Sequence, residues 1–208
     1  MHAVFKNISN SLAHACTIAL LVCQGGVHAL AQENTTKILE NERVAIWKIG
    51  ADARQSSPAQ RLQVPGVLIS LVDGAVRFKD AADTPSLRPA SGPAILIELK
   101  DFRIAPLELS RAVAQAFPRR GAKQILDNDR VIVWDFNWAK GMKTPMHFHD
   151  KDVVVVYLGS GTVRSIPLDG EPTAVPRSSG EVVFLRRGRT HVEECIDGPR
   201  RDIIVELK

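Results

Sequence analysis

The sequence predicts an all-β protein in which one strand pattern occurs twice. Short runs of β-branched and aromatic residues recur between Gly, Pro, Asp and Ser residues, and the two halves of the chain resemble each other in register. Regular spacing of such runs is typical of a β-sandwich or β-barrel. The expected strands are Val44–Trp47, Val67–Val72, Val131–Trp134, Val153–Leu158, Val182–Leu185 and Ile203–Leu207.

The internal repeat is strongest near the start of each copy. Ile38–Trp47 matches Ile125–Trp134 at an offset of 87 residues, with six of ten positions identical. The same offset places Leu71–Arg77 on the equivalent part of the second copy, Leu158-Gly-Ser-Gly-Thr-Val-Arg. The copies end alike in Ile97–Lys100 and Val205–Lys208, but at an offset of 108. We therefore expect the first copy to have lost about 21 residues near its end.

These matches predict two barrel-like halves, residues 36–105 and 122–208, joined by a linker over 106–121. The linker contains the one good helix candidate, Ser110–Phe117. Ser110 is a suitable N-cap residue, and Pro118 would end the helix.

Residues 1–31 have the pattern of a secretory signal peptide. They contain no acidic residue and one basic residue, Lys6, followed by the apolar stretch Cys16–Cys23 and by Ala29 and Ala31 before Gln32. The apolar stretch is shorter than the roughly 20 residues of a membrane-spanning helix, so cleavage is favoured over a membrane anchor. We therefore expect a periplasmic or secreted protein, with no membrane contact after cleavage.

The remaining chain would keep one cysteine, Cys195, so an internal disulfide bond is excluded there. The net charge of +4 would become +3 without Lys6. The chain has no long basic run and few aromatic residues, and nucleic acid is therefore not an expected partner.

Beyond residue 31 the histidines are His147, His149 and His191. Residues i and i+2 of a β-strand face the same way, so His147 and His149 would direct both imidazoles to one place. Such a pair is suited to binding a divalent metal ion. The alternative from this pair alone is two ordinary surface histidines.

The surroundings of these histidines resemble the two motifs of the cupin family, Gly-x5-His-x-His-x4-Glu-x6-Gly and Gly-x5-Pro-x-Gly-x2-His-x3-Asn. The spacing is kept throughout by Gly141, His147, His149, Gly161, Gly180, Gly188 and His191. The resemblance implies a jelly-roll barrel in which the three histidines bind one metal ion inside the barrel. The implied metals are iron, manganese, nickel, copper or zinc, with iron favoured. The implied reactions are dioxygenation, decarboxylation or isomerisation of small acids.

The chain departs from the cupin motifs at three positions. Val154 stands at the glutamate position, Arg186 at the proline position and Cys195 at the asparagine position. Asp152 lies two residues before Val154, hence on the same strand face, and could supply the missing carboxylate ligand. The alternative is that Asp152 belongs to a solvated turn with Lys151.

Glu193 shares a strand face with His191 and Cys195. Its carboxylate could bind the metal, act as a catalytic general base, or hold a histidine in place. Cys195 would lie inside the barrel, where a cysteine is usually an inert core residue. A redox or ligand role for Cys195 is the alternative.

Three arginines precede His191 in the chain: Arg186, Arg187 and Arg189. They could form an anion clamp at the barrel mouth for a carboxylate substrate, or a solvated basic turn. The first copy has Gln60 and Leu62 where the second has its paired histidines, and the second motif would fall in its missing stretch. We therefore expect the first copy to be structural, covering a sheet edge or imitating a partner subunit.

Two functions follow from these patterns. The first is a metal-dependent enzyme, because three histidines leave coordination positions open. The cupin resemblance implies that this enzyme is of the dioxygenase kind and acts on a small organic acid or thiol. The second is a non-catalytic periplasmic module that binds a metal or a small ligand. Either function implies a small-molecule partner, for which an anion is one candidate. Homodimer formation is left open.

Overall fold

The computed structural model describes residues 35–51, 64–80, 92–108 and 113–208. The expected signal peptide lies outside these residues, as do Gln60, Leu62 and Ser110. The described chain is all-β, as the sequence predicts. It contains no helix with the length and apolar character needed to cross a bilayer.

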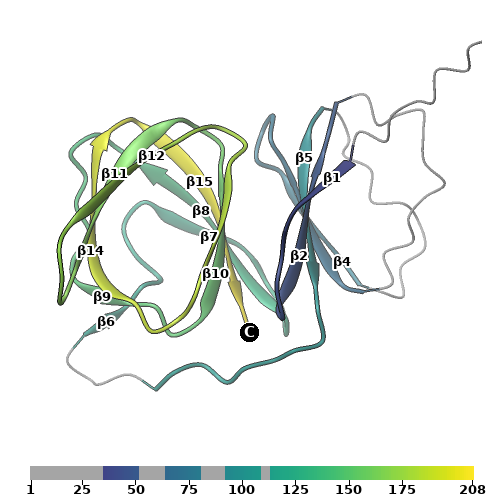
Figure 1. The fold of residues 1–208 in the computed structure, drawn as a ribbon, viewed down its shortest axis with the longest axis horizontal. Helices are drawn as coiled ribbons and strands as arrows, with labels where there is room; N and C mark the ends of the chain where they lie inside the picture. The colour runs from purple at the N-terminus through teal and green to yellow at the C-terminus, as the bar shows by residue number, and fades with distance from the viewer. Residues whose placement is uncertain (1–34, 52–63, 81–91, 109–112) are drawn as a thin grey trace, which may run out of the picture. The chain divides into compact units, whose positions relative to one another are not determined.

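The described strands form three five-stranded sheets (Figure 1). The N-terminal sheet has the order β1 (Thr35–Glu40), β2 (Val44–Ile49), β5 (Ala94–Leu99), β3 (Gly66–Ser70) and β4 (Val76–Lys79). The central sheet has the order β7 (Ala122–Asp127), β8 (Val131–Trp138), β15 (Arg200–Leu207), β10 (Asp152–Tyr157) and β13 (Val182–Leu185). The histidine sheet has the order β12 (Thr173–Arg177), β11 (Gly161–Pro167), β14 (Thr190–Asp197), β9 (His147–Phe148) and β6 (Ala114–Gln115).

The N-terminal sheet reproduces the central sheet strand for strand. Val44 lies opposite Leu99 as Val131 lies opposite Leu207. The first hairpin of each copy also carries its register shift at the same place, between Lys37 and Leu39 in one and between residues 124 and 126 in the other. The shared register shows that the sequence repeat is also a structural repeat.

Side-chain contacts repeat in the same way. Trp47 donates its indole N–H to Glu98 at 2.9 Å, and Trp134 donates to Glu206 at 2.8 Å. The side-chain oxygen of Asn41 accepts two backbone N–H groups in the first hairpin turn, and the side-chain oxygen of Asn128 does so in the second. These contacts explain why Asn and Trp occur at matching places in both copies.

The register corrects one part of the sequence alignment. Ile69 pairs with Val76 as Val156 pairs with Val182, so β4 corresponds to β13 and not to the segment that follows Leu158. The first copy is therefore shortened directly after β3, where the second copy has β11 and β12, and not near its end. A tight turn makes this possible, because Gly74 adopts a φ of 74°, which residues with a Cβ rarely adopt.

The first copy was also expected to be barrel-like. Its described residues form one sheet, and that sheet packs on the central sheet instead of closing on itself. Residues 81–91, which precede β5, lie outside the described part of the chain.

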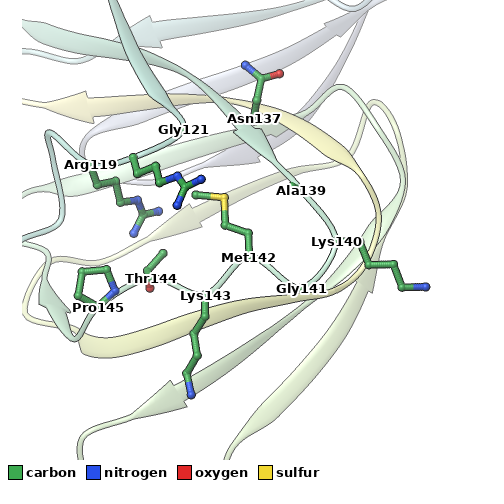
Figure 2. A pocket seen from close by; sticks show the side chains of 11 residues that line it. Arg119, Gly121, Asn137, Ala139, Lys140, Gly141, Met142, Lys143, Thr144 and Pro145 are labelled. Carbon is green, nitrogen blue, oxygen red and sulfur yellow. The ribbon is translucent and has the colours of Figure 1, made fainter.

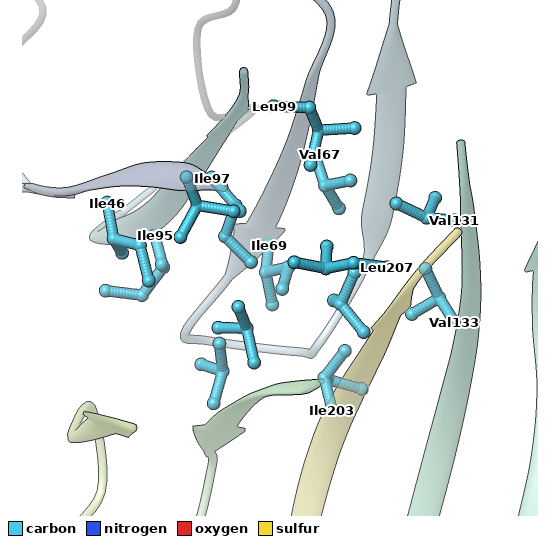
Figure 3. Packing of buried hydrophobic residues seen from close by; sticks show 14 residues of the cluster. Ile46, Val67, Ile69, Ile95, Ile97, Leu99, Val131, Val133, Ile203 and Leu207 are labelled. Atoms are coloured by element: carbon cyan, nitrogen blue, oxygen red, sulfur yellow. The ribbon is translucent and has the colours of Figure 1, made fainter. Parts of the chain in front are cut away.

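The central sheet has two buried faces. On one face its β-branched side chains pack against those of the N-terminal sheet (Figure 3). On the other face Trp134, Phe136 and Trp138 of β8 pack inside the barrel with residues of β10 and β14. Strand alternation separates the two sets, since Val131 and Val133 of the same strand belong to the first face. The two faces account for the near-continuous apolar sequence of β10.

The helix expected over Ser110–Phe117 is not formed in its described part. Ala114–Gln115 is strand β6, which pairs in parallel with β9, and Ala116 donates its N–H to the Phe148 carbonyl at 2.8 Å. Phe117 is buried in the barrel core. A helix this short is marginal in water, so pairing with β9 and burial of Phe117 override the local signals.

Candidate metal centre

The histidine sheet places the three histidines at one point inside the barrel. His147 on β9 lies directly opposite His191 on β14. His149 follows β9, and its backbone exchanges hydrogen bonds with the turn before β14: its N–H donates to Arg189 at 2.9 Å and its carbonyl accepts from Gly188 at 2.8 Å. Gly188 has a φ of 88°, which explains the glycine at this motif position. All three histidines are buried.

A fourth donor, Glu193 of β14, joins the histidines. One nitrogen from each imidazole and one Glu193 carboxylate oxygen all lie within 4.8 Å of one another. The Nε2 atoms of His149 and His191 are 3.1 Å apart, and His147 Nε2 is 3.6 Å from Glu193 Oε2. We refer to these four residues as the donor group.

Neighbouring groups orient the imidazoles. His147 Nδ1 lies 2.9 Å from the Pro145 carbonyl oxygen, and Nδ1–H can donate to it, which leaves the Nε2 lone pair directed at the donor group. His191 Nδ1 lies 2.8 Å from Ser165 Oγ and 3.1 Å from Arg189 Nη2. His149 Nδ1 is buried without a partner among the described residues.

The donor group has the charge state that a metal ion requires. Burial lowers the pKa of His147 and His149, and lowers that of His191 to about 4, so the imidazoles are neutral near pH 7. Burial acts to raise the pKa of Glu193, but the positively charged Arg119, and after it the neighbouring imidazoles, act in the opposite direction and bring that pKa to about 2. Three neutral imidazoles and one carboxylate could hold a divalent transition-metal ion.

Glu193 provides a carboxylate at the donor group, although the first cupin motif lacks its glutamate in this chain. Val154, which stands at that position, packs in the core between the N-terminal and central sheets and points away from the donor group. Glu193 comes from β14 instead, two residues after His191 on the same face. The shared face was the correct sequence signal for this residue.

The structure does not bring Asp152 into the donor group. Its Oδ2 lies 3.3 Å from Arg43 Nη1, and its Oδ1 accepts the backbone N–H of Arg187 at 2.8 Å. Asp152 and Val154 do share a strand face, as expected, but that face of β10 is turned toward the N-terminal sheet. We therefore leave Asp152 out of the proposed ligands.

The three arginines before His191 do not act together. Arg186 pairs with Glu42 at 2.8 Å, and Arg187 binds the Ala105 carbonyl. Only Arg189 reaches the donor group, through His191. The anion clamp proposed from the sequence is therefore not formed by Arg186 and Arg187. Cys195 is fully buried among apolar residues of the barrel core, as its interior position predicts.

Sequence reasoning missed Arg119, which lies just after Phe117. Its Nη1 is 2.8 Å from His147 Nε2, and its Nη2 is 2.9 Å from Glu193 Oε2. The guanidinium carbon lies 4.6 Å from the Phe117 ring centre and 4.5 Å from that of Phe136. The only sequence signal was a basic residue in the segment read as a linker, and nothing there indicated its long-range contacts.

Comparisons with known proteins support the family resemblance. No protein-family model matches the chain. Among curated proteins, the beta-alanine degradation protein BauB of Pseudomonas aeruginosa is 36% identical over 66 residues, which cover 32% of this chain and 68% of BauB.

Solved structures with a similar fold include two cupin proteins. One is a cupin domain from Bordetella pertussis, with 24% identity over 45% of this chain and 99% of that chain and a TM-score of 0.39. Another is a cupin 2 conserved barrel domain protein from Leptotrichia buccalis, with 16% identity over 84% of this chain and 88% of that chain and a TM-score of 0.41.

Three findings now agree. The motif spacing is kept around the histidines, the central and histidine sheets form the two layers of a jelly roll, and two thirds of BauB matches this chain at more than 30% identity. The chain belongs to the cupin superfamily.

Proposed function

We propose that this protein binds one divalent transition-metal ion, with iron favoured, through His147, His149, His191 and Glu193. We further propose that it is a metal-dependent enzyme of the dioxygenase kind that acts on a small organic acid or thiol. The observation that carries the proposal is the convergence of three neutral imidazoles and one ionised carboxylate within 4.8 Å inside the barrel.

The chemistry of the donors supports a reactive centre. A bound ion would supply a Lewis acid with coordination positions left for a ligand. His147 is oriented by Pro145, and Glu193 is kept ionised by Arg119. Besides serving as a ligand, Glu193 could accept a proton from a bound molecule, because its carboxylate lies at the centre and remains ionised.

The substrate class is supported by the relative. BauB is named for the degradation of beta-alanine, a small amino acid that carries a carboxylate. We extend to this protein only the general class, a small organic acid.

One observation favours the second candidate, a non-catalytic module for a metal or small ligand. Glu193 is a fourth protein donor, and each protein donor that binds leaves fewer coordination positions for a substrate. The two candidates therefore share the metal centre and differ in whether a bound molecule is converted.

We also propose that the protein acts outside the cytoplasm. Support comes from residues 1–31, with their apolar stretch and the Ala29-Leu-Ala31 sequence before Gln32.

Turnover measurements on iron-loaded protein test the enzyme proposal. The purified chain is loaded with Fe²⁺ and incubated in air with small carboxylic acids and thiols, and both oxygen uptake and product formation are followed. Metal-dependent turnover of at least one compound is expected, and the Glu193→Gln variant should lose it. Binding of the compounds without turnover by fully loaded protein would favour the binding module.

A further inference from the structure

A basic cavity adjoins the donor group. It has a volume of about 600 Å³, within the usual range for small-molecule sites. Four cationic residues line it, namely Arg119, Arg120, Lys140 and Lys143, and no acidic residue of the described chain does. In Figure 2 the side chains of Lys140 and Lys143 extend away from Met142.

Arg119 connects this cavity to the donor group. None of the four donors lines the cavity, but Arg119 touches His147 and Glu193 directly. Two neighbouring wall residues are in contact with the donor group as well. Thr144 Oγ1 lies 3.4 Å from His147 Nδ1, and the Pro145 carbonyl lies 2.9 Å from the same atom.

Arg119 and a metal ion compete for one lone pair. A neutral imidazole that carries its proton on Nδ1 has a single lone pair on Nε2. In His147 this lone pair faces Arg119 Nη1 at 2.8 Å. A metal ion bound to His147 Nε2 must therefore displace that contact, and its positive charge would also weaken the pairing of Arg119 with Glu193.

The displaced guanidinium would remain close to the centre. Its side chain is only 7% exposed, and its carbon lies against the rings of Phe117 and Phe136. Its Nε is already buried without a hydrogen-bond partner among the described residues. A buried guanidinium that loses its carboxylate partner requires another anion, because an unpaired buried charge is strongly unfavourable.

We infer that Arg119 is the ligand-recognition residue of this centre. It closes the donor group when no metal is bound, and once the metal displaces it from His147 it pairs with the carboxylate of a small organic acid that enters through the basic cavity. Arg120, Lys140 and Lys143 attract the acid, and the planar guanidinium forms the paired contact for which carboxylates are suited. This inference rests on the metal centre proposed above.

The test uses the full chain loaded with Co²⁺, whose visible absorption reports changes at the metal. Propanoate is the probe, and the uncharged propanamide is its control. We expect Arg119→Gln to weaken propanoate binding by about 10–100-fold, which corresponds to the loss of hydrogen bonds to a charged group. Arg120→Gln should weaken it by about two- to fivefold, as expected for an exposed charge. Arg164→Gln removes an equal charge outside the cavity and should change nothing.

Metal affinity gives an independent result. Removal of the competing guanidinium should make Arg119→Gln bind Co²⁺ about tenfold more tightly than the unaltered chain. In the unaltered chain propanoate should raise the affinity for Co²⁺, whereas propanamide should not. Co²⁺ and propanoate both favour the arrangement in which Arg119 has left His147, so each should increase the affinity for the other. This measurement needs no variant and remains decisive if Arg119→Gln fails to fold.

The outcomes separate the two proposals. Failure of the unaltered chain to bind Co²⁺ would overturn the metal centre itself. Normal Co²⁺ binding with equal propanoate affinity in the unaltered chain and a folded Arg119→Gln would overturn the role of Arg119 alone. The role of Arg119 would also be overturned if propanoate did not change the Co²⁺ affinity of the unaltered chain.

Discussion

Arg43 and Asp152 form an ion pair that is almost completely buried between the two copies of the repeat. Arg43 Nη1 lies 3.3 Å from Asp152 Oδ2, and the two side chains are 3% and 2% exposed. Arg43 also donates to the Lys208 carbonyl at 3.2 Å. Asp152, a candidate metal ligand from the sequence, therefore joins the N-terminal sheet to the central sheet.

This pair predicts that Asp152 affects stability and leaves metal binding intact. Asp152→Ala leaves Arg43 buried without its partner, which should lower the free energy of unfolding by about 3–5 kcal/mol in urea denaturation. Asp127→Ala, which removes an exposed partner of Lys208, should cost less than about 1 kcal/mol. A folded Asp152→Ala variant that has lost its metal would return Asp152 to the ligand set.

The first copy should contribute to the core of the whole described chain. Ile97 of β5 is fully buried against the central sheet, whereas Ile38 of β1 is 42% exposed. Ile97→Ala should lower the free energy of unfolding by about 2–5 kcal/mol. Ile38→Ala, the same chemical change on the surface, should alter it by about 0.5 kcal/mol or less. Equal effects of the two changes in urea denaturation would show that the sheets do not pack as described.

Tyr157, the only tyrosine of the chain, should titrate far above its ordinary range. Burial inside the barrel raises its pKa to about 12, against an opposing effect of the positively charged Arg177. The folded state therefore disfavours the ionised phenol, and stability should fall as the pH rises from about 10 to about 12. Absorbance at 295 nm measures the ionisation, with protein in guanidinium chloride as the reference. A folded protein with a midpoint near 10 would contradict the burial of Tyr157.

Export can be tested by sequencing the N-terminus of the protein recovered from outside the cytoplasm. We expect the mature chain to begin at Gln32, because Ala29 and Ala31 form the small-residue pattern before the cleavage site. Ala31→Lys should block this cleavage. A cytoplasmic protein that keeps residues 1–31 would refute the proposal.

Much of the fold followed from patterns within the sequence. The repeat predicted two related β-structures, and the shared register of their hairpins confirms the relation. The sequence alignment was wrong at β4, because the short segments next to turns have similar sequences. Strand pairing was needed to identify β13 as the strand of the second copy that corresponds to β4. The helix prediction near Phe117 failed because local signals do not reveal pairing with a strand more than thirty residues away.

The residues of the candidate site could likewise be predicted from the sequence only in part. Alternation correctly placed Glu193 beside His191, because His191 already marked the inner face of its strand. The same rule did not place Asp152 correctly relative to the donor group. Alternation shows which residues share a strand face, but it does not show which face points into the barrel. Arg119 could not be found at all, because its approach to His147 depends on a chain path that no local pattern encodes.

The central claim is that His147, His149, His191 and Glu193 together hold one metal ion. The most direct measurement is elemental analysis of the purified, folded chain and its His191→Ala variant after loading with Fe²⁺ and removal of loosely bound metal. We expect one equivalent in the unaltered chain and almost none in the variant, because the loss of one imidazole opens the site to water and chelators. Circular dichroism should show the same β-structure in both. A folded His191→Ala variant that retains a full equivalent of metal would contradict the site.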